Sequence, residues 1–313
     1  MEVGGTLPEA ELTERGLRPT PKGVTAWPRI TIVTAVRNGA RYIEDTIRSV
    51  ISQDYPNLEY IVIDGVSTDG TLDIIRKYEK DITWWVSQPD KGVYDALNTG
   101  FARSTGHIMG WLNASDQLHI NSILLVGSVF AGLPDVEWIT GRPTGFNASG
   151  MTILVKDLPH WSRHRFLAGA NHYIQQESTF WRRSLWERAG GRLDSSYRDA
   201  GDCELWVRFF RYAQLYSVDA LIGGFRPHAD AITSTQKLEY ERHFGEIIDR
   251  ELSSLQGAGK AKFFRRLDEF MQRIPKVRGL WQRTAIKALY QLPAADWPPV
   301  IEYQGDKWGF RGQ

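Results

Sequence analysis

The first third of the chain alternates apolar segments with amphipathic ones. Runs rich in β-branched residues, such as RITIVTA at 29–35 and LEYIVID at 58–64, are typical of strands buried on both faces. Between them, apolar residues recur at helical spacing from Ile43 to Ile51. The pattern repeats in predicted helices at 72–78 and 93–102 and predicted strands at 82–87 and 106–112. This alternation predicts an α/β fold, Rossmann-like, with a mainly parallel sheet flanked by helices.

The second half of the chain is less regular, and residues 141–175 fit no single pattern. Helices are predicted at 122–133, 184–190 and 202–213, and strands at 137–141 and 215–219. From residue 251 the chain becomes basic, and KAKFFRRLDEFMQRI at 260–274 has its apolar residues on one helical stripe. We therefore divide the chain into a loose extension (1–28), a catalytic domain (29–250) and a basic, helical C-terminal region (251–313).

Composition excludes several classes of protein. The net charge of +1 gives no electrostatic case for nucleic-acid binding. Cys203 is the single cysteine, so no internal disulfide can form, which suits a reducing compartment. No run of 18 apolar residues predicts a membrane span, and the polar N-terminus does not resemble a secretory signal. These features predict a cytoplasmic protein.

Polar side chains follow each of the predicted parallel strands. They are Thr34 and Asn38, then Asp64, then Asp90 and Lys91, and finally Asn113, Ser115 and Asp116. A lone aspartate at a strand end is more often a helix N-cap or a turn former. The carboxyl ends of parallel strands share one edge of the sheet, however, and ligands bind there. The set as a whole therefore predicts a binding site.

Several motifs occur in a characteristic order. ITIVTAVRN, VIDGVSTDGT, PDKGVYDALNTGFARSTG and GWLNASD resemble the donor-binding half of family 2 glycosyltransferases with the GT-A fold. QQESTFWRRSLWERAGG and DAGDCELWVRF resemble the acceptor-side segments of that family. The resemblance covers residues 29–235. It implies a metal-dependent, inverting transfer of a sugar from a nucleoside-diphosphate sugar.

The resemblance assigns donor-side roles. Thr34 and Asp64 match positions that hold the nucleoside, with Asp64 at the edge of the base. A carboxylate opposite the imide N–H of uracil makes a charge-assisted hydrogen bond, so UDP is the expected nucleotide. The other residues expected at the nucleotide-sugar are Asn38, Asp90, Lys91, Asp95 and Ser115.

The expected metal ligand is Asp116, and the expected ion is Mg²⁺ or Mn²⁺, which take oxygen ligands shared with phosphates and water. The family usually has two adjacent acidic residues where this chain has Ser115-Asp116. Serine brings no charge, so the departure bears on metal affinity. His228 matches a late histidine that joins the metal in many GT-A enzymes, and a structural histidine is an equally good interpretation.

On the acceptor side, Asp202 matches the general base of the family, which takes the proton of the acceptor hydroxyl. An N-cap role for Asp199 or Asp202 is the alternative, and Asp199 and Glu204 are the neighbours that could be confused with the base. Gln176 and Glu177 match a segment that binds acceptor hydroxyls.

We therefore expect sugar transfer to a glycan or lipid-linked glycan, in bacterial surface polysaccharide synthesis. A non-catalytic nucleotide-sugar-binding protein is the alternative, favoured by Ser115. A nucleotidyltransferase would usually have a glycine-rich basic loop after the first strand, which RNGARY does not resemble. The basic stretch at 260–292 has two interpretations, contact with an anionic membrane surface or packing on the catalytic domain.

Overall fold

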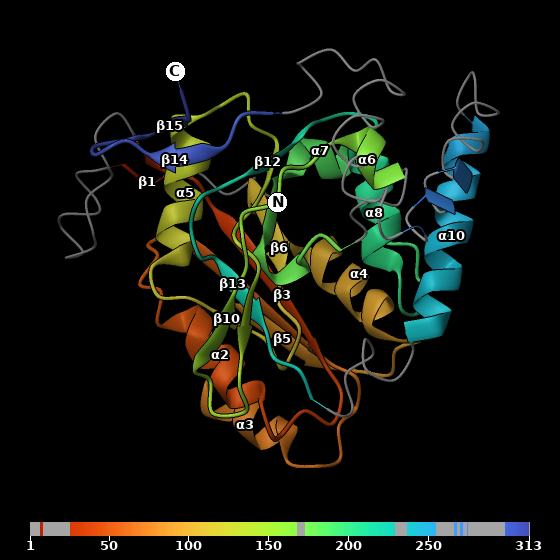
Figure 1. Ribbon diagram of the computed structural model, residues 1–313. Coiled ribbons are helices and arrows are strands. Elements are labelled where there is room, and N and C mark those ends of the chain that lie inside the picture. The colour runs from red at the N-terminus through yellow and green to blue at the C-terminus, as the bar shows by residue number, and fades with distance from the viewer. Residues whose placement is uncertain are drawn as a thin grey trace.

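The computed structural model describes residues 7–8, 26–167, 173–228, 237–254, 266–267, 270–271, 274 and 298–312. A mixed seven-stranded sheet lies at its centre, in the order β12-β8-β11-β6-β3-β4-β5 (Figure 1). The strands are β3 (Ile30–Val36), β4 (Leu58–Asp64), β5 (Trp84–Ser87), β6 (Ile108–Trp111), β8 (Trp138–Thr140), β11 (Thr179–Arg182) and β12 (Leu215–Ser217). As predicted, these first four strands pair in parallel: β3 with β4 and β6, and β4 with β5. β11 runs antiparallel between β6 and β8.

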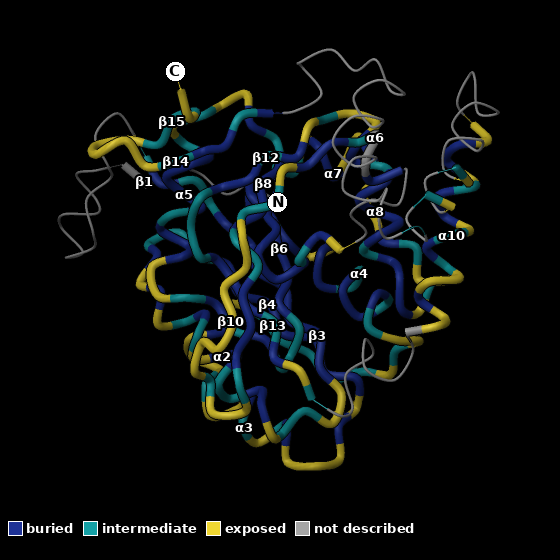
Figure 2. The backbone as a smooth tube through the Cα atoms, viewed as in Figure 1, coloured by how far each residue is buried: buried dark blue, intermediate teal, exposed yellow. Residues whose placement is uncertain are grey.

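Helices cover both faces of this sheet (Figure 1). One side carries α2 (Ile43–Ile51), α3 (Thr71–Lys77) and α5 (Ser122–Gly132), and the other carries α4 (Val93–Arg103), α6 (Arg163–Leu167), α7 (Arg183–Arg188), α8 (Gly201–Phe209) and α10 (Lys237–Ser254). Alternate strand residues supply the two cores: Val33 and Ile63 face α4 and α8, while Ile32 and Val62 face α2 and α5. The central strands are therefore buried on both faces (Figure 2).

A smaller sheet joins segments that are distant in the sequence. It has the order β10-β9-β13-β7. Its strands are β7 (Gln117–Leu118), β9 (Thr144–Phe146), β10 (Thr152–Val155) and β13 (Gly223–Phe225). β13 pairs antiparallel with β7, which brings the chain after Phe225 beside Asp116. Gly223 also lets β13 pass close to the turn that holds Glu177, because a Cβ atom there would lie 2.1 Å from the carbonyl oxygen of Glu177.

The C-terminal residues that the structure describes pack on the catalytic domain. β14 (Ile301–Tyr303) and β15 (Trp308–Phe310) form a hairpin, and Ile301 bridges to Val218. Arg311 binds Asp219 at 2.5 Å. This part of the predicted helical region is thus a β-hairpin. The predicted helix at 260–274 and the stretch at 260–292 lie largely outside the described residues.

At the other end of the chain, β1 (Leu7–Pro8) pairs with β2 (Ala26–Trp27), and most of the predicted extension at 1–28 lies outside the described residues. Within the described ranges, no helix has both the length and the apolar character needed to cross a bilayer. The division of the chain at residues 28 and 250 stays a prediction.

Candidate active site

Asp64 ends β4 at the carboxyl edge of the sheet and is fully buried. Its Oδ2 accepts hydrogen bonds from the backbone N–H of Ser67 at 3.0 Å and from the hydroxyl of Ser87 at 2.6 Å. Its Oδ1 is buried and has no hydrogen-bond partner among the described residues. A buried carboxylate oxygen without a partner is costly. Asp64 therefore suits a ligand that offers an N–H group.

Asn38 joins the loops that follow β3 and β4. Its backbone has a φ of 52°, in the left-handed region that asparagine tolerates better than most residues. Its backbone N–H donates to the Ser67 hydroxyl at 2.7 Å, and its Oδ1 accepts from the Thr68 N–H at 2.9 Å. Thr34 is buried in β3, and its hydroxyl accepts from that of Tyr60 at 3.1 Å. Both side chains thus make hydrogen bonds within the protein, Asn38 with the loop after β4 and Thr34 with Tyr60 of β4.

Asp90, Lys91 and Asp95 form the turn that begins α4. Asp90 Oδ1 accepts from the Gly92 N–H at 2.9 Å, and Asp95 Oδ2 accepts from the Lys91 N–H at 3.0 Å. The other Asp90 oxygen lies only 2.4 Å from where Gly65 would carry a Cβ atom. The carboxylate of Asp90 therefore lies against the loop after β4. The segments that follow β4 and β5 are thus adjacent, as the order of the strands in the sheet predicts.

Asp116 follows β6 and is fully buried. Its Oδ1 accepts from the Arg226 backbone N–H at 2.9 Å, and its Oδ2 accepts from the Asn113 amide at 3.1 Å. Burial raises the pKa of Asp116, and these two hydrogen bonds and the charge of Arg226 oppose that rise. Ser115, next to it, is partly exposed. A single carboxylate thus lies at the position of the predicted metal ligand.

Gln176 and Glu177 lie in the 3₁₀ turn η1 (Gln176–Ser178) and are both buried. Gln176 donates to the Trp111 carbonyl at 2.5 Å and accepts from Asn113 at 3.2 Å. Glu177 accepts from Gln175 at 2.7 Å. Burial, followed by the negative charge of Asp116, raises the pKa of Glu177. Both side chains thus make hydrogen bonds within the protein and lie close to Asp116.

Arg226 was not among the predicted site residues, although it lies two positions before His228. Its side chain is fully buried, 4.8 Å above the ring of Tyr42, and its Nη1 binds Asp45 at 3.0 Å. Its Nε and Nη2 are buried without partners among the described residues. The ring of His228 also lies beside Tyr42, at 5.3 Å, and its Nδ1 is likewise unpartnered. Arg226 thus lies close enough to Asp116 for its charge to lower the pKa of that carboxyl group, and it shares the ring of Tyr42 with His228.

The side chains near Asp116 could supply ligands for a divalent cation. No group of three or more His, Cys, Asp and Glu side chains within the described ranges could hold a metal by itself. Mg²⁺ and Mn²⁺ commonly take one or two protein carboxylates and complete their shell with phosphates and water. Asp116 offers one carboxylate and His228 one unpartnered nitrogen, which are donors of the kind that such an ion takes.

Asp202 lies in the first turn of α8, and its Oδ1 accepts from the hydroxyl of Tyr94 at 3.3 Å. Its side chain is partly exposed. Burial raises its pKa to about 6, and the charge of Asp199 adds to the rise, whereas the bonds from the Cys203 N–H and Tyr94 oppose it. Such a carboxylate is ionised at neutral pH and can still take up a proton.

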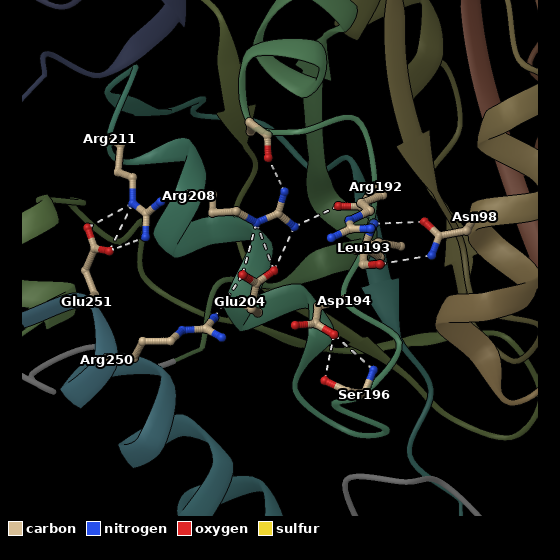
Figure 3. A network of polar contacts seen from close by, with 11 residues as sticks. Asn98, Arg192, Leu193, Asp194, Ser196, Glu204, Arg208, Arg211, Arg250 and Glu251 are labelled. Carbon is tan, nitrogen blue, oxygen red and sulfur yellow. Dashed lines mark hydrogen bonds and ion pairs between the residues drawn. The ribbon is translucent and has the colours of Figure 1, made fainter. Parts of the chain in front are cut away.

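The two neighbours of Asp202 are engaged elsewhere. Asp199 is buried and lies 2.5 Å from Nδ1 of His243 on α10. Glu204 is buried between Arg208 at 2.7 Å and Arg250 at 3.0 Å (Figure 3). A carboxylate held by two guanidinium groups is a structural anchor. Asp202 is partly exposed whereas Asp199 and Glu204 are buried, so Asp202 is the member of this group that a ligand can reach from solvent.

The sequence is similar to those of known glycosyltransferases. Residues 31–127 match the family model for Glycosyl transferase family 2. An uncharacterized glycosyltransferase of Mycobacterium tuberculosis is 29% identical over 198 residues, which are 59% of this chain and 70% of the relative. The putative teichuronic acid biosynthesis glycosyltransferase TuaG of Bacillus subtilis is 29% identical over 138 residues, 43% of this chain and 51% of its own.

Solved structures agree on the fold. S. aureus TarS, residues 1–349, in complex with UDP-GlcNAc superposes with a TM-score of 0.61 at 14% identity, covering 91% of this chain and 97% of that one. The mannosyltransferase PcManGT of Pyrobaculum calidifontis, in complex with GDP-Man and Mn²⁺, gives 0.51 at 18% identity, covering 88% and 90%. The segment 31–127 therefore belongs to glycosyltransferase family 2, and the chain is a glycosyltransferase with the GT-A fold.

Proposed function

We propose that this enzyme transfers a sugar from a UDP-sugar to a hydroxyl group of a glycan or lipid-linked glycan, with inversion at C1. The observation that carries the proposal is the contrast between Asp202 and its neighbours. Asp202 is partly exposed and has a pKa raised to about 6, whereas Asp199 and Glu204 are bound by basic side chains. An ionised carboxylate with a pKa just below neutral suits a general base.

The proposed step assigns each of these side chains a role. Asp202 takes the proton of the acceptor hydroxyl, whose oxygen forms a bond to C1 of the sugar while the bond from C1 to the diphosphate breaks. The nucleoside diphosphate leaves with that bonding pair. The free Oδ1 of Asp64 would accept from the imide N–H of uracil. Asp116 and His228 would hold Mg²⁺ or Mn²⁺, which neutralises charge on the departing diphosphate.

A role in bacterial surface polysaccharide synthesis is supported by the names of relatives. Besides TuaG, the poly-beta-1,6-N-acetyl-D-glucosamine synthase of Staphylococcus epidermidis is 26% identical over 169 residues, 51% of this chain and 41% of its own. We infer a cytoplasmic enzyme whose segment 260–292 contacts anionic lipid. Because the C-terminal hairpin packs on the catalytic domain, the test keeps the full chain and changes Lys260, Lys262, Arg265 and Arg266 to Gln. Unchanged co-sedimentation with phosphatidylglycerol vesicles would refute the lipid contact.

The transfer itself is tested with a panel of UDP- and GDP-sugars. A donor present at 100 times its Kd stabilises the fold by about 2.7 kcal/mol, which a thermal shift with and without Mn²⁺ detects. Asp202→Asn should keep that shift and lower turnover by about 10²–10⁴-fold. Asp194→Asn, in the turn before α8, is the matched control and should leave turnover unchanged. Near-normal turnover of Asp202→Asn would refute the base assignment, and no shift with any donor would refute nucleotide-sugar binding.

A further inference from the structure

We propose that His243 of α10 is a positioning residue for Asp202, because it holds Asp199 as a buried anion in the turn that begins α8. The inference rests on the proposed function and adds a residue to its machinery. Oδ1 of Asp199 lies 2.5 Å from Nδ1 of His243, and the two side chains are 1% and 13% exposed. A buried pair of ionisable groups three residues from the general base is a candidate part of the site.

The surroundings of His243 fix which of its ring nitrogens carries the proton. Nε2 lies 2.8 Å from Nη2 of Arg242. A guanidinium group has donors and no acceptor, so Nε2 accepts and the proton of the neutral ring is on Nδ1. Nδ1–H therefore donates to Asp199. A cationic ring would direct a second N–H at the guanidinium group. The neutral imidazole thus leaves the negative charge of Asp199 in place.

The turn that contains Asp199 leads directly into the first turn of α8. Ala200 is the N-cap residue, and Asp202 is the second residue of the helix. The backbone N–H of Glu204 donates to the carbonyl of Ala200 at 3.0 Å, which closes the first helical turn. Asp199 and Asp202 are therefore joined by a short, ordered stretch of backbone, so that a displacement of one also moves the other.

Two neighbouring helices hold this stretch. α10 holds it through the contact of His243 with Asp199. α4 holds it through Tyr94, whose hydroxyl donates to Asp202 at 3.3 Å and whose ring would lie 2.8 Å from a Cβ atom at Gly201. The bond from Tyr94 is long for two oxygen atoms, so it restrains the carboxylate weakly. The contact with His243 therefore supplies the stronger restraint.

Ion pairs keep α10 fixed against α8 (Figure 3). Arg250 of α10 binds Glu204 of α8 at 3.0 Å, and Arg211, just after α8, binds Glu251 of α10 at 2.5 Å. The side chains of Glu204 and Glu251 are both buried, so these contacts are shielded from solvent. His243 is therefore presented by a helix with a fixed place, which is what the support of a catalytic group requires.

Several titratable groups face the pair and the base. Around the imidazole they are Arg242, which is paired with Glu239 and Glu246, and Tyr197. Around Asp202, apart from Asp199, they are Tyr94, Tyr173, Glu177, Cys203 and Tyr240. Burial is the main cause of the raised pKa of Asp202, about 6, and the charge of Asp199 adds to the rise. Loss of that charge therefore lowers the pKa of Asp202.

Loss of the imidazole would change both the position and the charge of Asp199. Its Oδ2 has no hydrogen-bond partner among the described residues, so without His243 the buried carboxylate would have none at either oxygen. Such a carboxylate takes up a proton or moves towards water. The first change removes the negative charge beside Asp202, and the second displaces the turn that carries Asp202. His243 thus acts on the base through Asp199.

Three variants separate position from charge. His243→Asn keeps a donor in the place of Nδ1, His243→Leu removes the donor at similar volume, and Asp199→Asn keeps an acceptor and removes the charge. His160→Leu is the control for loss of an imidazole, because His160 is exposed and precedes α6. The pKa of Asp202 is measured on the full chain by a pH titration of carboxyl-¹³C aspartate NMR signals, with Asp202→Asn to assign its signal.

We expect the pKa of Asp202 to fall in Asp199→Asn and His243→Leu and to stay unchanged in His243→Asn and His160→Leu. A second readout is UDP released from UDP-GlcNAc, UDP-glucose or UDP-galactose with water as the acceptor. On the plateau above the titration, kcat should fall about 10–10²-fold in His243→Leu, because its base is displaced, and stay within about threefold in the other three variants. The thermal shift with UDP and Mn²⁺ should be the same in all of them.

Two results would overturn the proposal. One is the wild-type pKa of Asp202 in His243→Leu. The other is a pKa that moves as far in His243→Asn as in His243→Leu, since the donor at Nδ1 would then be irrelevant. If His243→Leu does not fold, His243→Gln replaces it, because its amide lies one carbon farther along the side chain and does not take the place of Nδ1.

The titration needs no turnover, so this inference and the proposed function fail separately. If Asp202→Asn retains UDP release, the assignment of the base fails, whatever the titration shows for His243. If Asp202→Asn abolishes UDP release while His243→Leu keeps the wild-type plateau and the wild-type pKa of Asp202, the positioning role fails and the transferase activity stands. If the wild type releases no UDP from these donors, the titration alone decides whether His243 acts on Asp202.

Discussion

Glu59 clamps the amino-terminal ends of three central strands, and its neutralisation should destabilise the fold without touching the site. The residue is 3% exposed. Its carboxylate accepts from the Thr31 hydroxyl at 2.5 Å, from the Thr105 N–H and hydroxyl at 2.7 and 2.8 Å, and from the Gly106 N–H at 3.3 Å. Arg29 binds it at 3.1 Å. In Glu59→Gln, one oxygen becomes an NH₂ group that faces donors.

The expected loss follows from these contacts. Breaking a buried ion pair from one side costs about 3–5 kcal/mol, and because Arg29 is partly exposed we expect the lower end, about 3 kcal/mol. At about 2 °C per kcal/mol for a chain of this size, Tm should fall by about 6 °C. Glu59 lies five residues before Asp64, about 17 Å along the strand. We therefore expect kcat/KM at 25 °C to stay within about twofold of the wild type.

The effect should depend on pH. Burial raises the pKa of Glu59, but the hydrogen bonds from Thr105 and Thr31 and the charge of Arg29 outweigh it, so the pKa is lowered overall. A carboxyl group with a lowered pKa stabilises the fold above its unfolded pKa of about 4.3, and this contribution disappears as the pH falls through the folded pKa. The gap between wild type and Glu59→Gln should be full at pH 7 and shrink at pH 3.

Urea unfolding of the wild type, Glu59→Gln and Glu79→Gln at pH 7, 5, 4 and 3 measures this gap. Glu79 is exposed and serves as the control for loss of one negative charge. Exposed ion pairs usually contribute less than about 1 kcal/mol to the free energy of unfolding. A loss of that size or smaller in Glu59→Gln at pH 7 would therefore refute the clamp. A gap that is the same at pH 7 and pH 3 would refute the assignment of the effect to the charge of Glu59.

Three further predictions concern the site. Asp199→Asn removes a negative charge that raises the pKa of Asp202, so the acidic limb of the kcat/KM pH profile should move to lower pH; an unmoved or raised limb contradicts this. Asn38→Ala puts alanine at a φ of 52° and removes the acceptor of the Thr68 N–H, so unfolding in urea should be easier by about 1–2 kcal/mol, and an unchanged midpoint would count against it. Asp116→Asn should abolish the part of the donor-induced thermal shift that needs Mn²⁺, and a retained Mn²⁺ effect would exclude Asp116 as a ligand.

The strands that the sequence predicts well are those buried on both faces. β3 and β4 are nearly continuous apolar runs because helices cover both sides of the sheet. The smaller sheet shows the opposite case. Its strands are two to four residues long, and they come from segments that are distant in the sequence. Such short segments carry no periodicity, so the place where Arg226 meets Asp116 could not be read from local pattern.

α10 is absent from the predicted elements although its pattern is present in the sequence. Tyr240, Phe244, Ile247, Ile248 and Leu252 recur at helical spacing and are all buried against α8. Because α10 supplies Tyr240 and His243, the miss also hid side chains that pack against the start of α8, where Asp202 lies.

The Ser115-Asp116 pair shows how a carboxyl group that is missing from a sequence motif can be supplied by another segment of the chain. The resemblance predicts two adjacent acidic residues, and this chain has one. The fold inserts β11 beside β6, so the turn before β11 lies next to the residues that follow β6. Glu177 in that turn is buried and close enough to Asp116 for the charge of Asp116 to raise its pKa. A second carboxylate therefore lies near Asp116 after all. Two buried carboxylates resist joint ionisation unless a cation lies near them, and the buried guanidinium of Arg226 is one such cation that the fold itself supplies.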